Sequence, residues 1–115
     1  MIRTIWVALN LLVSTSTLSL AVIGSALLRL RGDVYDRLSR LWSRWTLAAS
    51  GAKVRIEGAQ HIRPDAPKVI ISNHQSWYDV WALAAYTPGR YRFVAMKELA
   101  RIPLFRQAWQ AAGHI

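Results

Sequence analysis

The stretch that decides the fold runs from a short apolar segment into a histidine and an aspartate, and it reads Ile70-Ile71-Ser72-Asn73-His74-Gln75-Ser76-Trp77-Tyr78-Asp79. Residues 68–71 are typical of a short buried strand. Ser76, with Asp79 three positions later, is typical of a helix start before the apolar residues 80–85. His74 would then lie in the turn between strand and helix, close to Asp79. A histidine held by a carboxylate can take a proton from a hydroxyl group at neutral pH.

The same pattern also has a purely structural explanation. Asp79 can cap the helix and favour its positive end, a contribution of about 1 kcal/mol, and His74 is then an ordinary loop residue. The two roles of Asp79 do not exclude each other. If the chemistry is hydroxyl activation, this helix start could also supply backbone N–H groups toward the negative charge that develops during reaction, at positions that the sequence does not fix.

The composition limits the classes of protein to which the chain can belong. Its 115 residues leave room for one small domain. Hydrophobic residues make up 53% of the chain, yet 15 Lys and Arg against 6 Asp and Glu give a net charge of +9, which suits an anionic surface as partner. The absence of cysteine excludes a disulfide framework and a thiolate zinc site, and we predict no metal site.

Residues 1–50 are predicted to form a membrane-associated helical region. No charged side chain occurs from Ile5 to Leu28, and a helix of this length reaches about 36 Å against a hydrocarbon core of about 30 Å. It can span a bilayer with some tilt, or insert partially, because Asn10 and residues 14–17 are polar. A cleaved signal peptide fits less well because the apolar run is too long. By the positive-inside rule, the arginines that follow place the rest of the chain in the cytoplasm; they are Arg29, Arg31, Arg37, Arg40 and Arg44.

A second helix is predicted from about Val34 to Ala49, with one apolar face and a basic flank. This helix either lies among lipid headgroups, with its arginines on lipid phosphate, or packs its apolar face on the domain and leaves a solvated basic rim. The basic charge does not indicate a nucleic-acid partner, because the arginines cluster beside an apolar segment and not among exposed aromatic side chains.

Residues 51–115 are predicted to form the second region, the first part of an α/β domain with an incomplete sheet. Strands are expected over residues 53–57, 68–71 and 91–95. Helices are expected over residues 76–86, 97–100 and 104–112, the last starting at Pro103 and ending at Gly113. Alternation of strands and helices indicates an α/β architecture.

Further blocks follow residues 73–79 in a fixed order: Phe93-Val94-Ala95-Met96-Lys97-Glu98-Leu99, then Ile102-Pro103-Leu104-Phe105, then Gly113-His114-Ile115. Over about Gly51 to Ile115 the chain thereby resembles the glycerolipid acyltransferases, specifically the bacterial 1-acylglycerol-3-phosphate acyltransferases. The resemblance implies transfer of an acyl group from acyl-CoA or acyl carrier protein to the free hydroxyl of a lysophosphatidate, without a metal or bound cofactor. It implies that His74 is the general base and that Asp79 orients its ring, at the cytoplasmic face of a bacterial inner membrane.

Other positions carry weaker expectations. Lys97 and Arg101 are predicted to meet substrate phosphate, with solvated surface as the alternative. Arg106 departs from the family, which commonly has Gly there, and His61 and His114 are assigned no chemical role. Family members continue with Phe-Ile-Asp-Arg and Glu-Gly-Thr-Arg blocks, so we expect an amino-terminal portion of the enzyme. The alternatives are a non-catalytic membrane-anchored fragment and a family member with a different hydroxyl acceptor.

Overall fold

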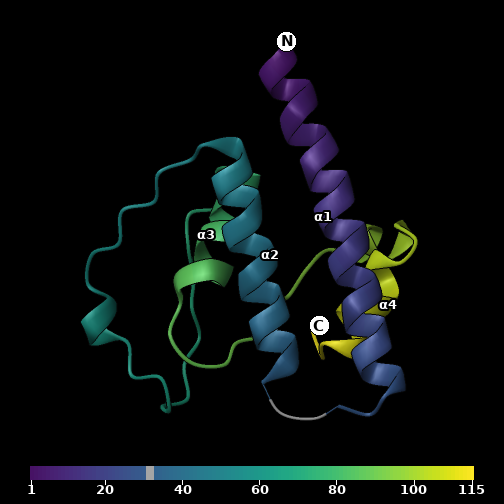
Figure 1. Cartoon of the computed structure of the whole chain (residues 1–115). Helices are drawn as coiled ribbons and strands as arrows, with labels where there is room; N and C mark the ends of the chain where they lie inside the picture. Colours follow the sequence, from purple (N-terminus) through teal and green to yellow (C-terminus); the bar gives the residue numbers. More distant parts are fainter. Residues whose placement is uncertain (31–32) are drawn as a thin grey trace.

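The computed structural model describes residues 1–30 and 33–115, and its regular elements are helices (Figure 1). Arg31, one of the five clustered arginines, lies outside the described residues. In chain order the elements are α1 (Ile2–Leu27), α2 (Val34–Ser50), the 3-10 helix η1 (Ala59–His61), α3 (Trp77–Tyr86), the 3-10 helix η2 (Lys97–Arg101) and α4 (Phe105–Ala111). The structure confirms the helix predicted across the apolar segment 5–28 and the helices predicted over 34–49, 76–86 and 104–112. The predicted and observed helix ends differ by no more than three residues.

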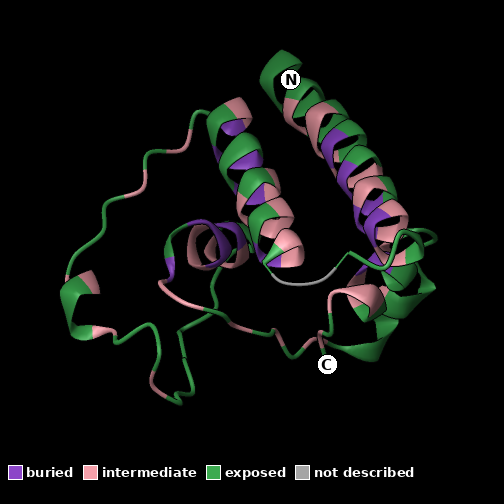
Figure 2. Cartoon of the chain, turned by 60° about the horizontal axis from the view of Figure 1, so that its bottom comes forward, coloured by how far each residue is buried: buried purple, intermediate pink, exposed green. Residues whose placement is uncertain are grey.

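Helices α1 and α2 lie side by side as an antiparallel pair (Figure 1). Trp42 of α2 donates its indole N–H to Thr15 Oγ1 of α1 at 3.2 Å. Buried residues form stripes along both helices (Figure 2). Many of them are small and polar, which lets helix backbones approach closely. They are Ser14, Ser19 and Ser25 on α1 and Ser43, Thr46 and Ser50 on α2.

The first turn of α1 closes the carboxyl end of α2. The guanidinium of Arg3 donates to the carbonyl of Ser50 at 2.8 Å, and the indole N–H of Trp6 donates to the carbonyl of Ala49 at 3.2 Å. Gly51 follows with φ of 71°, the left-handed conformation that commonly ends helices. The last carbonyls of a helix lack intrahelical partners, so α1 supplies part of the cap of α2. The amino-terminal helix is therefore part of the packed structure.

Helix α3 packs on α2 through a small aromatic core. Trp81, only 5% exposed, lies with Leu47 and Ala85, and its ring meets that of Trp42 edge to face at 6.3 Å. Two arginines of α2 also bind this part of the chain. Arg40 donates to the carbonyl of Gly89 at 2.6 Å, and the guanidinium of Arg44 lies 5.7 Å from the centre of the Tyr86 ring. Of the two interpretations of the second helix, the structure favours packing on the domain.

The predicted α/β sheet stays a prediction, because no residue among those that the structure describes is assigned to a strand. One pair of hydrogen bonds does have the parallel pattern. Ala95 donates its N–H to the carbonyl of Ile115 at 3.0 Å, and Ile115 donates to the carbonyl of Phe93 at 3.0 Å. The segment 93–95 is therefore already paired to the chain that follows α4, which packs on α1.

Candidate active site

The start of α3 is built by Ser76. The Ser76 hydroxyl oxygen accepts the N–H of Tyr78 at 3.2 Å, while the Asp79 carboxylate accepts the N–H of Ser76 at 2.8 Å. These reciprocal bonds form a capping box, as the sequence predicts. Ser76 itself is extended, with φ of −152° and ψ of 155°, so the chain reaches the helix from an extended segment. The cap fixes the position of the first turn of α3 and therefore the position of Asp79.

The structure brings His74 and Asp79 together. His74 Nδ1 lies 3.3 Å from Asp79 Oδ2, and the same oxygen accepts the N–H groups of Gln75 at 2.7 Å and Ser76 at 2.8 Å. Asp79 therefore caps the helix and contacts the histidine ring at the same time. Because Nδ1 faces the carboxylate, the second ring nitrogen, Nε2, is left for another partner. The His74 side chain is 58% exposed, so a substrate can reach it.

Asp79 is held in its ionised form. The N–H groups of Ser76 and Gln75 lower the pKa of this carboxyl below 3.8, and His74 adds a smaller lowering effect. At neutral pH the carboxylate can accept a hydrogen bond from the N–H at Nδ1 and stabilise a positive charge on the ring. This is the electrostatic arrangement in which a histidine acts as a general base through its other nitrogen.

The helix start offers few free N–H groups to a developing negative charge. The N–H groups of Gln75 and Ser76 are bonded to Asp79, and the N–H of Tyr78 is bonded to the Ser76 hydroxyl. A donor that is already satisfied by a side chain cannot also hold a substrate oxygen without losing that bond. The capping side chains therefore occupy donors that could otherwise serve the reaction.

Lys97 and Arg101 are not brought to this pair. Both lie exposed on η2, which contacts α4, whereas α3 contacts α2. In the part of the chain that the structure describes, η2 and α3 do not contact each other. The predicted contact of Lys97 and Arg101 with substrate phosphate stays a prediction. Arg106, the departure from the family pattern, is exposed on α4.

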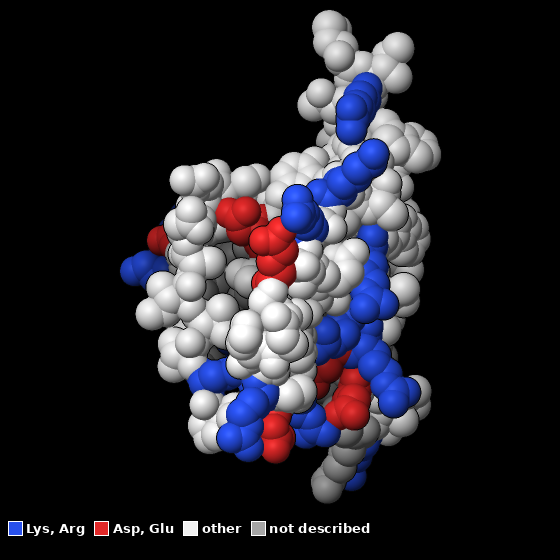
Figure 3. All heavy atoms as spheres, turned by 90° about the vertical axis from the view of Figure 1, so that its left-hand side faces the viewer, with Lys and Arg blue, Asp and Glu red and all other residues white. Residues whose placement is uncertain are grey.

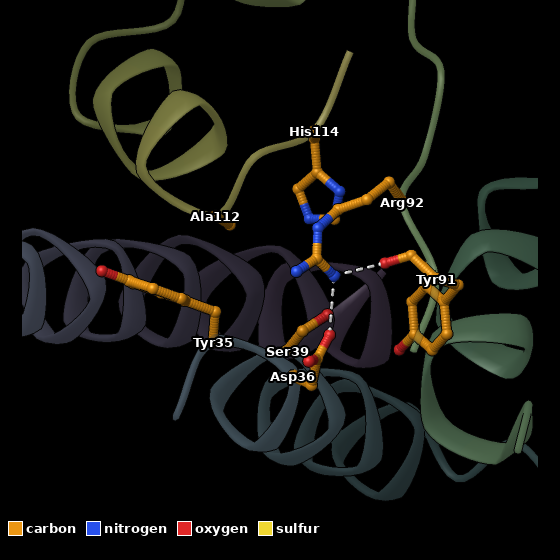
Figure 4. A pocket seen from close by; sticks show the side chains of 7 residues that line it. All are labelled: Tyr35, Asp36, Ser39, Tyr91, Arg92, Ala112 and His114. Carbon is orange, nitrogen blue, oxygen red and sulfur yellow. Dashed lines mark hydrogen bonds and ion pairs between the residues drawn. The ribbon is translucent and has the colours of Figure 1, made fainter. Parts of the chain in front are cut away.

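A second cluster of polar side chains was missed by the sequence analysis (Figure 4). Asp36 on α2 has a largely buried side chain, 10% exposed, and pairs with the guanidinium of Arg92 at 2.8 Å. His114 lies beside them and accepts the N–H of Phe93 through Nδ1 at 3.1 Å. Burial, and secondly the charge of Arg92, lower the pKa of His114 to about 4. The cavity between these residues has no room for a ligand. The cluster is therefore interpreted as a structural contact between α2 and the carboxyl-terminal segment.

Tyr91 belongs to the same cluster. Its hydroxyl donates to the carbonyl of Ala84 on α3, and burial raises its pKa above 10.0. Its ring lies 5.4 Å from the guanidinium of Arg40. No sequence signal could have found the cluster, since residues 36 and 92 are 56 positions apart and carry no shared pattern.

Comparison with known proteins gives a consistent picture. A family model described as "Acyltransferase" matches residues 53–115. The chain is 41% identical over 49 residues to the human and the bovine 1-acyl-sn-glycerol-3-phosphate acyltransferase alpha, and 39% identical over 49 residues to the ovine protein. Each alignment covers 43% of this chain and only 17% of the relative. No solved structure matches.

The segment matched by the family model contains His74, Asp79 and the residues that hold them, together with η2 and α4. It begins just after α2 ends and so leaves the helical pair α1–α2 outside. Since the matched segment is more than half of the chain, the protein belongs to the acyltransferase family.

Proposed function

We propose that this chain carries the general base of an enzyme that acylates the free hydroxyl of 1-acylglycerol-3-phosphate to give phosphatidate, with acyl-CoA or acyl carrier protein as the thioester donor. The observation that carries the proposal is the shared oxygen of Asp79, which holds His74 Nδ1 and the start of α3 together. The similarity to the human 1-acyl-sn-glycerol-3-phosphate acyltransferase alpha supports the choice of acceptor. A member of the same family with a different hydroxyl acceptor is the alternative.

The proposed reaction follows from the positions of the ring nitrogens. Nε2 of His74 accepts the hydroxyl proton as the acceptor oxygen bonds to the thioester carbonyl carbon. The tetrahedral intermediate collapses, the carbon–sulfur bond breaks, and the leaving thiolate takes the proton from the imidazolium. Asp79 is a positioning residue that keeps the proton on Nδ1 and stabilises the imidazolium. This reaction requires no metal and no bound cofactor, because the acyl group is supplied by the thioester as a co-substrate.

A lipid acceptor calls for a membrane location, and α1 is the element that supports it. Among the described helices, α1 alone is long and apolar enough to cross a bilayer. Its outward face exposes large apolar side chains, namely Ile2, Ile5, Trp6, Leu9, Leu12, Val13, Leu20 and Leu27. These side chains would cover several hundred Å² of lipid-facing surface, which is uncommon on a soluble monomer.

The packing of α1 favours shallow insertion over a full span. α2 lies along α1, and the contacts of Arg3 and Trp6 place the last carbonyls of α2 beside the first turn of α1. If α1 crossed the hydrocarbon core, α2 and its arginines would enter it too, at a cost of several kcal/mol. We therefore propose that α1 lies with its outward face in one leaflet. A bacterial inner membrane with the domain facing the cytoplasm remains a prediction from the sequence.

The decisive experiment replaces His74 in the whole protein that the gene encodes, as distinct from the isolated 115-residue chain. His74→Ala should lower phosphatidate formation from palmitoyl-CoA and 1-palmitoyl-lysophosphatidate by about 10²–10⁴-fold, while membrane association is kept. Asp65→Asn, which changes an exposed loop acid outside the site, is the matched surface control and should keep turnover. Full turnover by His74→Ala would refute the assignment of the base.

A second assay addresses the possibility that the chain is a non-catalytic membrane fragment. The isolated 115-residue chain is given the same donor and acceptor. Turnover that is lost in His74→Ala would make this chain sufficient for the reaction. No turnover by either the isolated chain or the protein from its gene would refute the proposed acyl transfer and favour the membrane fragment.

A further inference from the structure

The segment that carries both His74 and Asp79 is closed at its base. Gly89, which follows α3, lies directly against Pro64, which precedes the segment leading to His74. A Cβ atom at Gly89 would clash with the carbonyl oxygen of Pro64 and would lie 3.0 Å from the Pro64 Cα. Residues 64–89 therefore form a loop whose two ends meet, and His74 and Asp79 both lie within it.

One side of this closure is shaped by Lys68. Its ammonium group donates to the carbonyls of Arg63 at 2.5 Å, Ala66 at 3.1 Å and Pro64 at 3.3 Å. An ammonium carries three N–H donors, so these carbonyls use all of them and leave none for a ligand. Hydrogen bonds from a charged donor are also stronger than neutral ones. Lys68 therefore bends the turn 63–66 around its ammonium and presents Pro64 to Gly89.

Lys68 is bound by the backbone and not by an acid. Figure 3 shows the side of the molecule on which this loop lies, and acidic side chains lie beside basic ones along its lower edge. Lys68 nevertheless forms no ion pair with a carboxylate in the part of the chain that the structure describes, not even with Asp65 of the same turn. A surface lysine ordinarily keeps its ammonium in water on a flexible stem. The ordering of this one points to a role in the shape of the loop.

The other side of the closure is held by the packed helices. The guanidinium of Arg40, on α2, donates to the carbonyl of Gly89 at 2.6 Å. The N–H of Thr87 is bonded to the carbonyl of Leu83 at 2.9 Å, so the chain reaches Gly89 directly from the end of α3. Pro64 therefore rests against a point that α2 and α3 fix.

The closure sets where the chain enters the turn that holds His74. Asp79 is held by the first turn of α3, whereas His74 is reached from Lys68 through an extended segment. Six residues of extended chain span about 20 Å at most, so a shift at the start of this segment is passed on to His74. Lys68 acts through its side chain and uses none of the N–H groups that a sheet would pair. It therefore fixes the start of residues 68–71 whether or not they are paired as a strand.

We propose that Lys68 is a positioning residue of the acyl transfer, because its ammonium closes the loop 64–89 and thereby holds His74 Nδ1 against Asp79 Oδ2. We call the contact of Pro64 with Gly89, held by Lys68 and Arg40, the clasp. The inference rests on the proposed function for the reaction, but the clasp itself can be tested without the reaction. Lys68 has no free N–H for a substrate and acts through the position of His74.

The test replaces Lys68 in the whole protein that the gene encodes. Lys68→Met keeps the length of the side chain but removes its donors, whereas Lys68→Arg keeps a cation with several N–H groups. Lys53→Met is the matched control, because Lys53 is exposed and forms no ion pair with the residues that the structure describes. Kinetics with palmitoyl-CoA and 1-palmitoyl-lysophosphatidate give kcat and KM, and circular dichroism verifies that each variant is folded.

We expect Lys68→Met to lower kcat by about tenfold and to change the KM of either substrate by less than about twofold, because a displaced base affects the reaction and not the binding of substrate. Lys68→Arg should restore kcat to within about threefold of the unchanged protein, since a guanidinium can also donate to several carbonyls. Lys53→Met should leave kcat as it is.

A double variant separates positioning from a general loss of stability. In Asp79→Asn, His74 has already lost its carboxylate, so Lys68→Met should lower kcat there by less than about twofold. A residue that only stabilises the fold would reduce the active fraction equally in both backgrounds. Equal losses of kcat in the presence and absence of Asp79 therefore overturn the proposal.

A second measurement is independent of turnover. Gln75 and Ser76 donate their N–H groups to Asp79, so the hydrogen exchange of these two amides reports on the geometry of the turn. Lys68→Met should speed the exchange of the peptide that contains them by about tenfold, because the closed state of the loop becomes less populated. Lys53→Met should leave this exchange unchanged.

The two proposals fail separately. Turnover that survives in His74→Ala refutes the proposed base, while the exchange measurement still decides whether Lys68 closes the loop. Unchanged exchange and unchanged kcat in Lys68→Met refute the clasp and leave the base standing. Faster exchange with unchanged kcat confines Lys68 to the structure of the loop and overturns its role in positioning His74.

Discussion

Asp79 Oδ2 lies 3.3 Å from His74 Nδ1 and at the same time accepts the two N–H groups that precede α3. Asp79→Asn separates these roles, because an amide oxygen can still accept the N–H bonds while the negative charge is lost. We expect turnover to fall by about tenfold or more, since the imidazolium loses its counter-charge, while α3 remains folded. Steady-state kinetics beside circular dichroism measure the two effects, and unchanged kcat would limit Asp79 to capping.

The same carboxylate predicts a pH dependence of stability. The pKa of Asp79 is lowered below 3.8 in the folded chain, chiefly by the N–H groups of Ser76 and Gln75. The stabilisation is therefore complete above pH 3.8 and is lost as the pH falls through the lower folded value. Urea unfolding at pH 6 and at pH 3 should show a smaller loss in Asp79→Asn than in the unchanged protein. Equal losses would mean that Asp79 does not contribute.

Trp81 anchors the helix that carries Asp79. It is 5% exposed and lies between Leu47, Ala85 and the ring of Trp42. Trp81→Ala should lower the free energy of unfolding by about 3–5 kcal/mol, the usual cost of emptying a buried tryptophan site. Trp45→Ala is the matched control, since Trp45 is 41% exposed on α2, and it should cost about 1 kcal/mol or less. Similar costs for the two variants would contradict the proposed core.

The helices of this chain could be predicted because their signals are local. Ser76 and Asp79 form their capping box within four residues, and Gly113 ends the last helical segment with φ of 75°. The pairing of His74 with Asp79 could be predicted for the same reason, since a turn before a helix start brings positions five apart together. What the sequence analysis found correctly depends on neighbours along the chain.

Contacts between distant segments could not be predicted in this way. Arg40 was expected to face either lipid or solvent, but it donates to the carbonyl of Gly89, 49 positions away. A helical projection shows which side of α2 is basic, but it contains no information on what packs there. The same holds for Asp36 and Arg92. Strand pairing also depends on distant partners. Among the residues that the structure describes, the bonds of Ile115 with Phe93 and Ala95 indicate where a sheet would begin.

Among the glycines that the structure describes, Gly89 leaves the least room for a side chain. Its φ is +82°, and a Cβ there would lie 2.4 Å from the carbonyl oxygen of Pro64. Gly89→Ala should therefore destabilise the chain by about 2 kcal/mol or more, from left-handed strain together with the clash. Gly24→Ala is the opposite control, because nothing lies within 4 Å of its Cβ position and α1 is helical there. It should stabilise by about 0.5–1 kcal/mol in urea unfolding. Equal effects would contradict the turn.

His114 provides the last test, because the fold holds it in its neutral form. Its pKa falls from 6.5 to about 4, first through burial and then through the charge of Arg92. Below pH 6.5 the unfolded chain binds a proton that the folded chain does not bind until about pH 4, so stability should fall as the pH is lowered across this window.

His114→Asn separates titration from structure. The Asn side-chain oxygen can replace Nδ1 as acceptor of the Phe93 N–H, but it takes up no proton. The variant should therefore show a shallower decline of unfolding free energy between pH 6.5 and pH 4 than the unchanged chain. His61→Asn, a change at the exposed last residue of η1, should leave the decline as it is. A decline that persists unchanged in His114→Asn would assign the pH dependence to other groups.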